Sequence, residues 1–195
     1  MIRANFKRFS LISTRLGEIK PQKLHSKRLF IIIEGNRNWI GRLATDMYER
    51  IVESEQETIE LGLRLADLLQ PADVLTLEGD LGAGKTTFTK SIAKGLGITR
   101  TVNSPTFTIL KQYEGRYPLN HLDVYRLADS DEDLGWDELF YGDAVSIVEW
   151  AHLIQEDLPP ERLAIQILRL EEDKRQFIFE PIGKRYEQLC KELFE

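Results

Sequence analysis

The stretch DVLTLEGDLGAGKTT, residues 73–87, decides the fold. Its first six residues are a short and mainly apolar run, which is too brief for a helix and typical of a buried strand. Gly79, Gly84, Lys85 and Thr86 then occupy every defined position of the pattern G-x-x-x-x-G-K-[ST]. Apolar side chains at helical spacing follow. This order of strand, glycine-rich turn and amphipathic helix predicts that the turn is a phosphate-binding loop and not a chance cluster of glycines.

The expected phosphate site depends on backbone geometry as much as on side chains. Glycines let the chain curl tightly, so that successive amide groups converge on the phosphates, and the following helix presents its positive end to them. Lys85 would neutralise the β- and γ-phosphates, and the hydroxyl of Thr86 would hold a Mg²⁺ ion. The residues expected to contact the nucleotide here are Asp80, Leu81, Gly82, Ala83, Gly84, Lys85, Thr86 and Thr87.

A site of this kind also needs an acidic residue at the tip of a neighbouring strand, where it holds or orients the metal. Two residues qualify, because Glu149 ends the apolar run AVSIVE and Asp123 ends NHLD. The alternative for either one is an ordinary solvated carboxylate at a strand end. Trp150 follows Glu149 directly and is expected either in the core or close to the nucleotide.

The rest of the chain predicts a mixed sheet. A capping box, SEQE, opens a helix at Ser54, and a leucine stripe continues that helix toward Pro71. Further on we expect two hairpins, at residues 106–125 and 163–180, and a buried strand at residues 144–150. A short acidic helix is expected at residues 131–140 and a closing helix at residues 184–194. We therefore predict an α/β fold of the P-loop NTPase type, with three layers, helices on both faces of the sheet, and antiparallel hairpins in the C-terminal half.

Composition narrows the cellular setting. Cys190 is the only cysteine in the 195 residues, which excludes an intramolecular disulfide framework and favours a reducing, cytoplasmic compartment. The longest purely apolar run, LFIII at residues 29–33, is far shorter than a membrane span requires. The first residues also lack the pattern of a secretory signal peptide. We expect a cytoplasmic protein with no membrane partner.

The first 50 residues differ from the rest in charge. They carry 11 Lys and Arg against 4 Asp and Glu, although the whole chain has a net charge of −6. Three interpretations remain open: a basic arm that contacts nucleic acid, a transit peptide, or a disordered or adventitious extension before a true start at Met47. We expect the last, and so divide the chain into an N-terminal extension, residues 1–50, and a P-loop ATPase domain, residues 51–195.

Several blocks together resemble one family, TsaE, the small bacterial ATPase of tRNA threonylcarbamoyladenosine synthesis. The matching blocks are GDLGAGKTTF (79–88), SPTFTIL (104–110), HLDVYRL (121–127), LGWDELF (134–140) and IVEW (147–150). The resemblance covers about residues 54–180 and leaves the basic arm outside it. It is specific because the phosphate loop alone is common, whereas the other blocks beside it are not.

The resemblance implies a role for each matching residue. Thr86 and Glu149 would be Mg²⁺ ligands, and Asp123 would orient or activate the attacking water. Ser104, Pro105 and Thr106 would form a switch-like loop beside the γ-phosphate. Near the base of ATP would lie Ser54 and either Lys174 or Arg175. Ser54 also has an ordinary explanation as a helix cap, and the two basic residues have one as hairpin side chains.

The function implied by the resemblance is that of an accessory ATPase. Such a protein would bind and hydrolyse Mg-ATP in complex with the TsaB–TsaD pair, which modifies tRNA, so that tRNA would be an indirect partner. Lys85, Asp123 and Glu149 would carry the chemistry, and activity alone would be weak. Two alternatives stay open: a small-molecule or nucleoside kinase, although no arginine-bearing lid is visible, and a nucleotide-gated scaffold that does not hydrolyse ATP.

Overall fold

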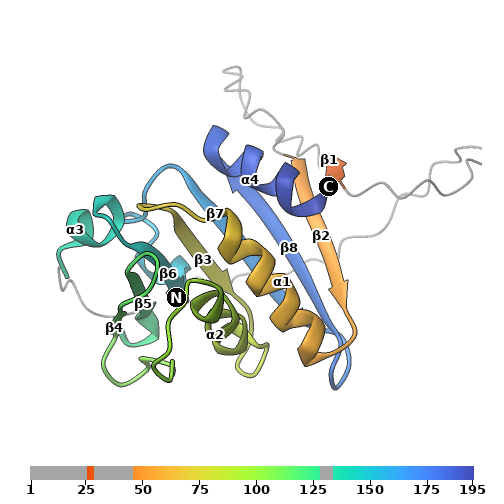
Figure 1. Ribbon diagram of the computed structural model, residues 1–195, viewed down its shortest axis with the longest axis horizontal. Coiled ribbons are helices and arrows are strands. Elements are labelled where there is room, and N and C mark those ends of the chain that lie inside the picture. Colours follow the sequence, from red (N-terminus) through yellow and green to blue (C-terminus); the bar gives the residue numbers. More distant parts are fainter. Residues whose placement is uncertain (1–25, 29–45, 128–133) are drawn as a thin grey trace, which may run out of the picture.

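The structure of the protein, a computed structural model, describes residues 26–28, 46–127 and 134–195. Within these ranges the strands form one sheet in the order β1-β2-β8-β7-β3-β6-β5-β4 (Figure 1). No helix in these ranges is long and apolar enough to cross a membrane. The strands are β1 (Ser26–Arg28), β2 (Asp46–Val52), β3 (Val74–Glu78), β4 (Leu110–Tyr113), β5 (Leu119–Asp123), β6 (Val145–Glu149), β7 (Arg162–Arg169) and β8 (Arg175–Ile182).

The helices confirm the expected alternation with the strands. The α-helices are α1 (Glu55–Leu68), α2 (Lys85–Gly95), α3 (Trp136–Tyr141) and α4 (Lys184–Phe194), and two short 3₁₀ helices are η1 (Val124–Leu127) and η2 (Ala151–Ile154). The side chain of Ser54 accepts a hydrogen bond from the amide of Glu57, and Glu57 in turn accepts one from the amide of Glu53. The capping box read from the sequence therefore begins α1.

The centre of the sheet is parallel and its flanks are antiparallel. Strand β3 pairs in parallel with β6 and β7, and β6 pairs in parallel with β5. The β4–β5 and β7–β8 pairs are the two expected hairpins. Because parallel neighbours end at the same edge, the carboxyl ends of β3, β6 and β5 lie side by side, and this edge is where ligands bind in open α/β sheets.

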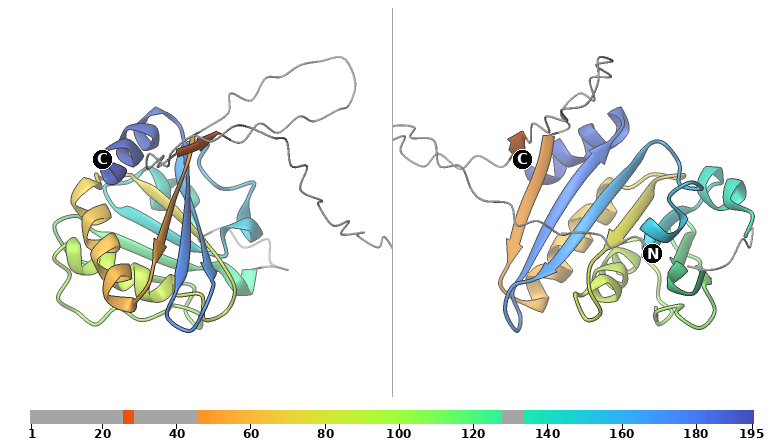
Figure 2. Two further views of the ribbon diagram at one scale, coloured as in Figure 1. Left: turned by 90° about the vertical axis from the view of Figure 1, so that its right-hand side faces the viewer. Right: turned by 180° about the vertical axis from the view of Figure 1, so that it is seen from behind.

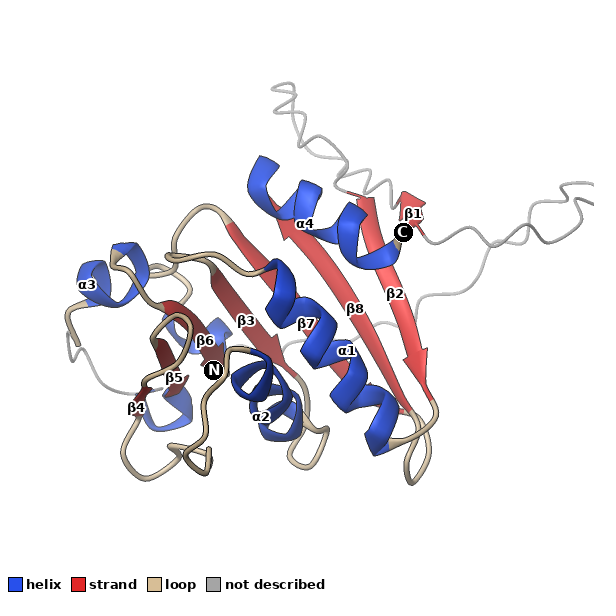
Figure 3. Ribbon diagram, in the orientation of Figure 1, coloured by secondary structure: helices blue, strands red, loops and turns tan. Residues whose placement is uncertain are grey.

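Two apolar clusters lie on opposite faces of the sheet. The larger one packs α1, α2 and α4 against one face, with Phe88, Phe177 and Leu189 fully buried. The smaller one packs α3 and the two 3₁₀ helices against the other face, around Leu122 and Phe140. Figures 2 and 3 show the long helices gathered on one side of the strands. The predicted α/β fold with three layers is confirmed, with the second helical layer made of short elements.

The expected boundary after residue 50 falls inside β2. This strand pairs antiparallel with β8, from Tyr48 opposite Phe179 to Val52 opposite Arg175. Tyr48 and Val52 are buried, and the ring of Tyr48 lies 5.1 Å from that of Phe194. The strand was missed because its pairing partner comes from the far end of the chain. The folded unit therefore includes residues that we had placed in the extension.

The basic extension is described only in part. Residues 26–28 form β1, which pairs antiparallel with β2 at the edge of the sheet. Residues 1–25 and 29–45 lie outside the described residues, as do residues 131–133 of the expected acidic helix. The three interpretations of the basic arm therefore stay predictions.

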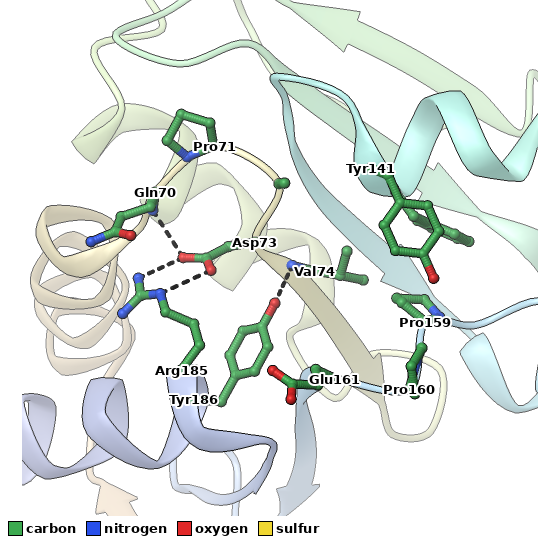
Figure 4. A pocket seen from close by; sticks show the side chains of 12 residues that line it. Gln70, Pro71, Asp73, Val74, Tyr141, Pro159, Pro160, Glu161, Arg185 and Tyr186 are labelled. Carbon is green, nitrogen blue, oxygen red and sulfur yellow. Dashed lines mark hydrogen bonds and ion pairs between the residues drawn. The ribbon is translucent and has the colours of Figure 1, made fainter.

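The start of β3 carries a pocket at the opposite end of that strand from the phosphate loop (Figure 4). Beside it, Arg185 of α4 forms an ion pair with the buried Asp73, with 2.7 Å between Nη2 and Oδ2, and also donates to the carbonyl of Leu68. The hydroxyl of Tyr186 accepts a hydrogen bond from the amide of Val74. These contacts tie α4 to the connection between α1 and β3, so they have a structural role.

Candidate nucleotide site

The phosphate loop leaves β3 and enters α2 through three glycines with positive φ. Gly79, Gly82 and Gly84 have φ values of 149°, 79° and 112°, a region that other residues rarely adopt. A side chain at Gly79 would also collide with the carbonyl oxygen of Ile167 on β7. No side chain caps the amino end of α2. Its first amide groups are thus available to an anion.

Lys85 lies under this loop and is buried. Its Nζ donates hydrogen bonds to the carbonyls of Gly79 at 2.6 Å and Asp80 at 3.1 Å, and lies 4.0 Å from the centre of the Trp150 ring. Trp150 has a φ of 64°, an uncommon conformation for a bulky residue, and this turn after β6 puts its ring beside the ammonium group. Trp150 also packs against the smaller apolar cluster, so the structure places it both at the edge of the core and beside the phosphate loop.

Burial lowers the pKa of Lys85, because the desolvated ammonium group is disfavoured. Nearby carboxylates oppose that shift, and they are Glu149, Asp123, Glu78 and Asp80. One ammonium group therefore faces four carboxylates, three at the ends of β3, β5 and β6 and the fourth, that of Asp80, in the phosphate loop. This excess of negative charge favours a cation in addition to Lys85.

Glu149 and Thr86 lie side by side at the amino end of α2. The hydroxyl of Thr86 donates to Oε1 of Glu149 at 3.3 Å, although the two residues are 63 positions apart. The same Oε1 lies 2.8 Å from Nε2 of His121, and both of these residues are buried. Hard oxygen ligands in this arrangement suit Mg²⁺. No group of three or more His, Cys, Asp and Glu side chains that could hold a metal occurs among the described residues.

Asp123 makes a different set of contacts from those of Glu149, which is its direct neighbour across the β5–β6 pair. Its Oδ2 accepts hydrogen bonds from Ser104 at 3.1 Å and Thr106 at 2.6 Å, and its Oδ1 accepts one from the amide of Tyr125. The structure thus links Asp123 directly to the loop for which the resemblance implies a switch-like role.

That loop is held in a strained turn. The amides of Thr108 and Ile109 both donate to the carbonyl of Pro105. Ile109 has a φ of 64°, which is costly for a β-branched residue. Lys111 donates to the carbonyl of Ser104, and Arg126 donates to that of Thr106. A strained segment held by side chains of its neighbours is typical of a functional loop.

The structure places the residues expected near the base at one edge of the loop. Arg175 donates through Nε to the carbonyl of Ala83 at 2.9 Å, so the β7–β8 hairpin contacts the phosphate loop directly. Lys174 forms an ion pair with Glu53 beside the cap of α1, and the Ser54 hydroxyl is used by that cap. These contacts bring the three residues to one side of the cradle, whereas their role toward a base stays a prediction.

The remaining loop residues differ in exposure. Leu81 is 94% exposed at the tip of the loop. Ala83 is buried, and its amide donates to the carbonyl of Asp80. Thr87 lies in the first turn of α2, where its carbonyl accepts a hydrogen bond from Ser91. Thus Leu81 contributes backbone and not a packed side chain to the cradle.

Sequence reasoning missed two members of the site. His121 was read only as part of a matching block, yet its side chain contacts Glu149. Glu78 ends β3 and accepts hydrogen bonds from both the backbone and the ring of His152, each at 2.8 Å. The signal for both was available, because each lies at or near the carboxyl end of a central strand.

Comparison with known proteins agrees with this geometry. The family model described as "Threonylcarbamoyl adenosine biosynthesis protein TsaE" matches residues 52–177. The chain belongs to the TsaE family. Every site residue expected above lies inside the matched range.

Individual TsaE relatives show how far the similarity extends. The tRNA threonylcarbamoyladenosine biosynthesis protein TsaE of Bacillus subtilis is 60% identical over 139 residues, which are 71% of this chain and 88% of the relative. The protein of the same name from Treponema pallidum is 40% identical, over 65% of this chain and 95% of the relative. The crystal structure of Bacillus subtilis YdiB superposes with a TM-score of 0.68 at 50% identity, and it covers 76% of this chain and 95% of that one. The solved structure thus supports the fold described above.

Proposed function

We propose that this TsaE-family protein binds and hydrolyses Mg-ATP as the accessory ATPase of bacterial tRNA threonylcarbamoyladenosine modification. It would act in the cytoplasm in complex with the TsaB–TsaD pair and reach tRNA through that complex. The names of its TsaE relatives support the pathway. The contact between Thr86 and Glu149 at the amino end of α2 carries the proposal that it uses a metal-bound nucleotide.

The residues of the site divide the work by their contacts. The free amides of the loop and of the first turn of α2 would bind the phosphates, and Lys85 would leave the carbonyls of Gly79 and Asp80 to neutralise them. Thr86 and Glu149 would hold Mg²⁺. That ion, when bound, neutralises charge on the β- and γ-phosphate oxygens.

Asp123 would orient the attacking water. Its carboxylate already accepts hydrogen bonds from Ser104 and Thr106, so the loop and the water-orienting group would move together. A group that acts mainly in the transition state contributes to turnover more than to nucleotide binding. We therefore assign Asp123 to hydrolysis and Glu149 to the metal.

The test is a comparison of nucleotide turnover with and without the partner pair. Purified protein is mixed with Mg-ATP alone and then with TsaB–TsaD, and ADP and free phosphate are measured together with a pull-down of the pair. We expect slow hydrolysis alone and faster hydrolysis in the complex, with equal amounts of ADP and phosphate. ADP without phosphate would indicate transfer to an acceptor, as in a kinase, and ATP-dependent association without turnover would indicate a non-hydrolysing scaffold.

A further inference from the structure

Among the described residues, His121 makes a side-chain hydrogen bond with Glu149 that the proposed function does not use. It lies in β5, two residues before Asp123, and is fully buried. Its Nε2 lies 2.8 Å from Oε1 of Glu149, which is shorter than the 3.3 Å contact from Thr86. Its other ring nitrogen, Nδ1, is buried and has no hydrogen-bond partner among the described residues.

The orphaned nitrogen fixes how the ring is used. A proton on Nδ1 would be buried without an acceptor, and Nε2 would then turn a lone pair toward the Glu149 carboxylate. With the proton on Nε2, the ring donates to Oε1 and only a weak acceptor is left unpaired. The second arrangement satisfies both the carboxylate and the buried N–H group, so His121 acts as a donor to Glu149.

This donor decides which carboxylate oxygen stays free. Both contacts of Glu149 with side chains, from His121 and Thr86, are made through Oε1. Oε2 accepts no hydrogen bond from the part of the chain that the structure describes. A carboxylate held through one oxygen keeps the other available for a cation, as in metal sites where an outer hydrogen bond orients the ligand.

We propose that His121 is a positioning residue, whose Nε2–H group orients the Glu149 carboxylate for the metal that accompanies the nucleotide. The proposal rests on the proposed function, because it requires Glu149 to serve a metal-bound nucleotide. It predicts that His121 affects the gain in nucleotide affinity that Mg²⁺ provides. It does not predict a change in the affinity for nucleotide without metal, since among the described residues the His121 side chain is hydrogen-bonded to Glu149 and not to the phosphate loop.

The test uses variants that differ in the donor. His121→Gln can place an amide N–H group where Nε2 lies, because both nitrogens are four bonds from Cα. His121→Leu fills the site without a donor, and His121→Met serves if the leucine variant does not fold. Asn120→Leu is the matched control, since Asn120 is also buried in β5 but donates to Leu139 and Ser146 on the other face of the sheet.

The measurement is the affinity for a non-hydrolysable ATP analogue, by calorimetry, with Mg²⁺ and with chelator. We expect His121→Leu to reduce the Mg²⁺-linked gain about tenfold or more, the usual effect of removing an outer hydrogen bond from a metal ligand. His121→Gln should restore most of the gain, and Asn120→Leu should keep it. Thermal unfolding of each variant without ligand shows whether a loss of stability accompanies the change.

The outcomes separate this inference from the proposed function. A full Mg²⁺-linked gain in His121→Leu would overturn the positioning role while leaving the proposed function intact. Equal losses in His121→Leu, His121→Gln and Asn120→Leu would also overturn it, because they would reflect general destabilisation. A wild-type protein that binds the analogue with no gain from Mg²⁺ would overturn the metal assignment and this inference together.

Discussion

Replacement of Lys85 by methionine separates binding from stability more sharply than any other change in the site. The ammonium group is buried, and it is held by the carbonyls of Gly79 and Asp80 and by the Trp150 ring. Methionine is one atom shorter than lysine, keeps an unbranched apolar side chain and removes the charge. If Lys85 serves the nucleotide, the variant should lose affinity without losing its fold.

The magnitudes follow from the environment of Lys85. Loss of a charge-assisted contact with phosphate costs about 1.5–3 kcal/mol, which is roughly ten- to a hundredfold in affinity. In the absence of nucleotide, the lowered pKa of Lys85 indicates that desolvation of the ammonium group outweighs its attraction to the nearby carboxylates, so loss of the charge should not itself destabilise the fold. We therefore expect the free energy of unfolding of Lys85→Met to stay within about 1 kcal/mol of wild type, the net value of a typical hydrogen bond.

The pKa of Lys85 predicts how both the stability and the ATP affinity depend on pH. Burial lowers the pKa of Lys85 in the folded protein below the ordinary value of 10.5. Between these two values the unfolded chain holds a proton that the folded chain lacks, so the contribution of Lys85 to stability rises with pH through that window. Bound phosphates favour the charged form, so ATP affinity should fall with rising pH in the same window. Lys85→Met should show neither effect.

Calorimetry with Mg-ATP and urea unfolding, each from neutral pH upward, measure both quantities. An unchanged ATP affinity in Lys85→Met would refute the phosphate assignment. A loss of several kcal/mol of stability without nucleotide would instead show that Lys85 mainly holds the loop carbonyls together.

Three further changes test other parts of the structure. Glu149→Gln should weaken hydrolysis and also the Mg²⁺ dependence of nucleotide binding, whereas Asp123→Asn should lose hydrolysis and keep its nucleotide affinity. Calorimetry measures the affinity and phosphate release measures hydrolysis. Equal losses of affinity in the two variants would refute the separate roles. Arg185→Met leaves the buried Asp73 unpaired and should cost about 3 kcal/mol in urea unfolding, and a cost near zero would show that the pair does not fasten α4. Burial raises the pKa of Cys190 to about 12, so the buried thiol contributes stability at neutral pH that is lost as pH rises from 9 toward 12. At pH 8 the rate of Cys190 alkylation should be set by unfolding. Rapid alkylation of the native protein would contradict the burial of this thiol.

Much of the fold could be predicted because its signals are local. The capping box at Ser54 needs only four residues, and the phosphate loop needs eight. The hairpins around residues 114–116 and 171–174 bring together neighbours in the sequence. Strand β2 carries no such signal, since charged residues interrupt its alternation and Ile51 is 48% exposed. This strand forms because it pairs with β8, which lies more than 120 residues away in the sequence, and no local sequence pattern predicts that pairing.

The candidate site shows the same division between local and distant information. Residue types and strand ends predict that Glu149 and Asp123 lie at one edge of the sheet, and their separate roles were implied only by the resemblance. The structure adds different contacts with distant segments, Glu149 with Thr86 and Asp123 with Ser104. Likewise, Arg175 could be placed near the nucleotide from the resemblance, whereas its bond to the carbonyl of Ala83 required the folded hairpin.

The parallel register explains why these two roles sit so close together. Leu77 at the end of β3 lies opposite Glu149, and Glu149 lies opposite Asp123 on the next strand. The carboxylate that faces α2 and the one that holds the Ser104–Thr106 loop are thus neighbours in a single row across the sheet. One strand spacing, about 4.8 Å, separates the backbones of Glu149 and Asp123. Under the proposed function, a nucleotide that loses its γ-phosphate would therefore change the electrostatic environment of Asp123 and, through its hydrogen bonds with Ser104 and Thr106, that of the loop.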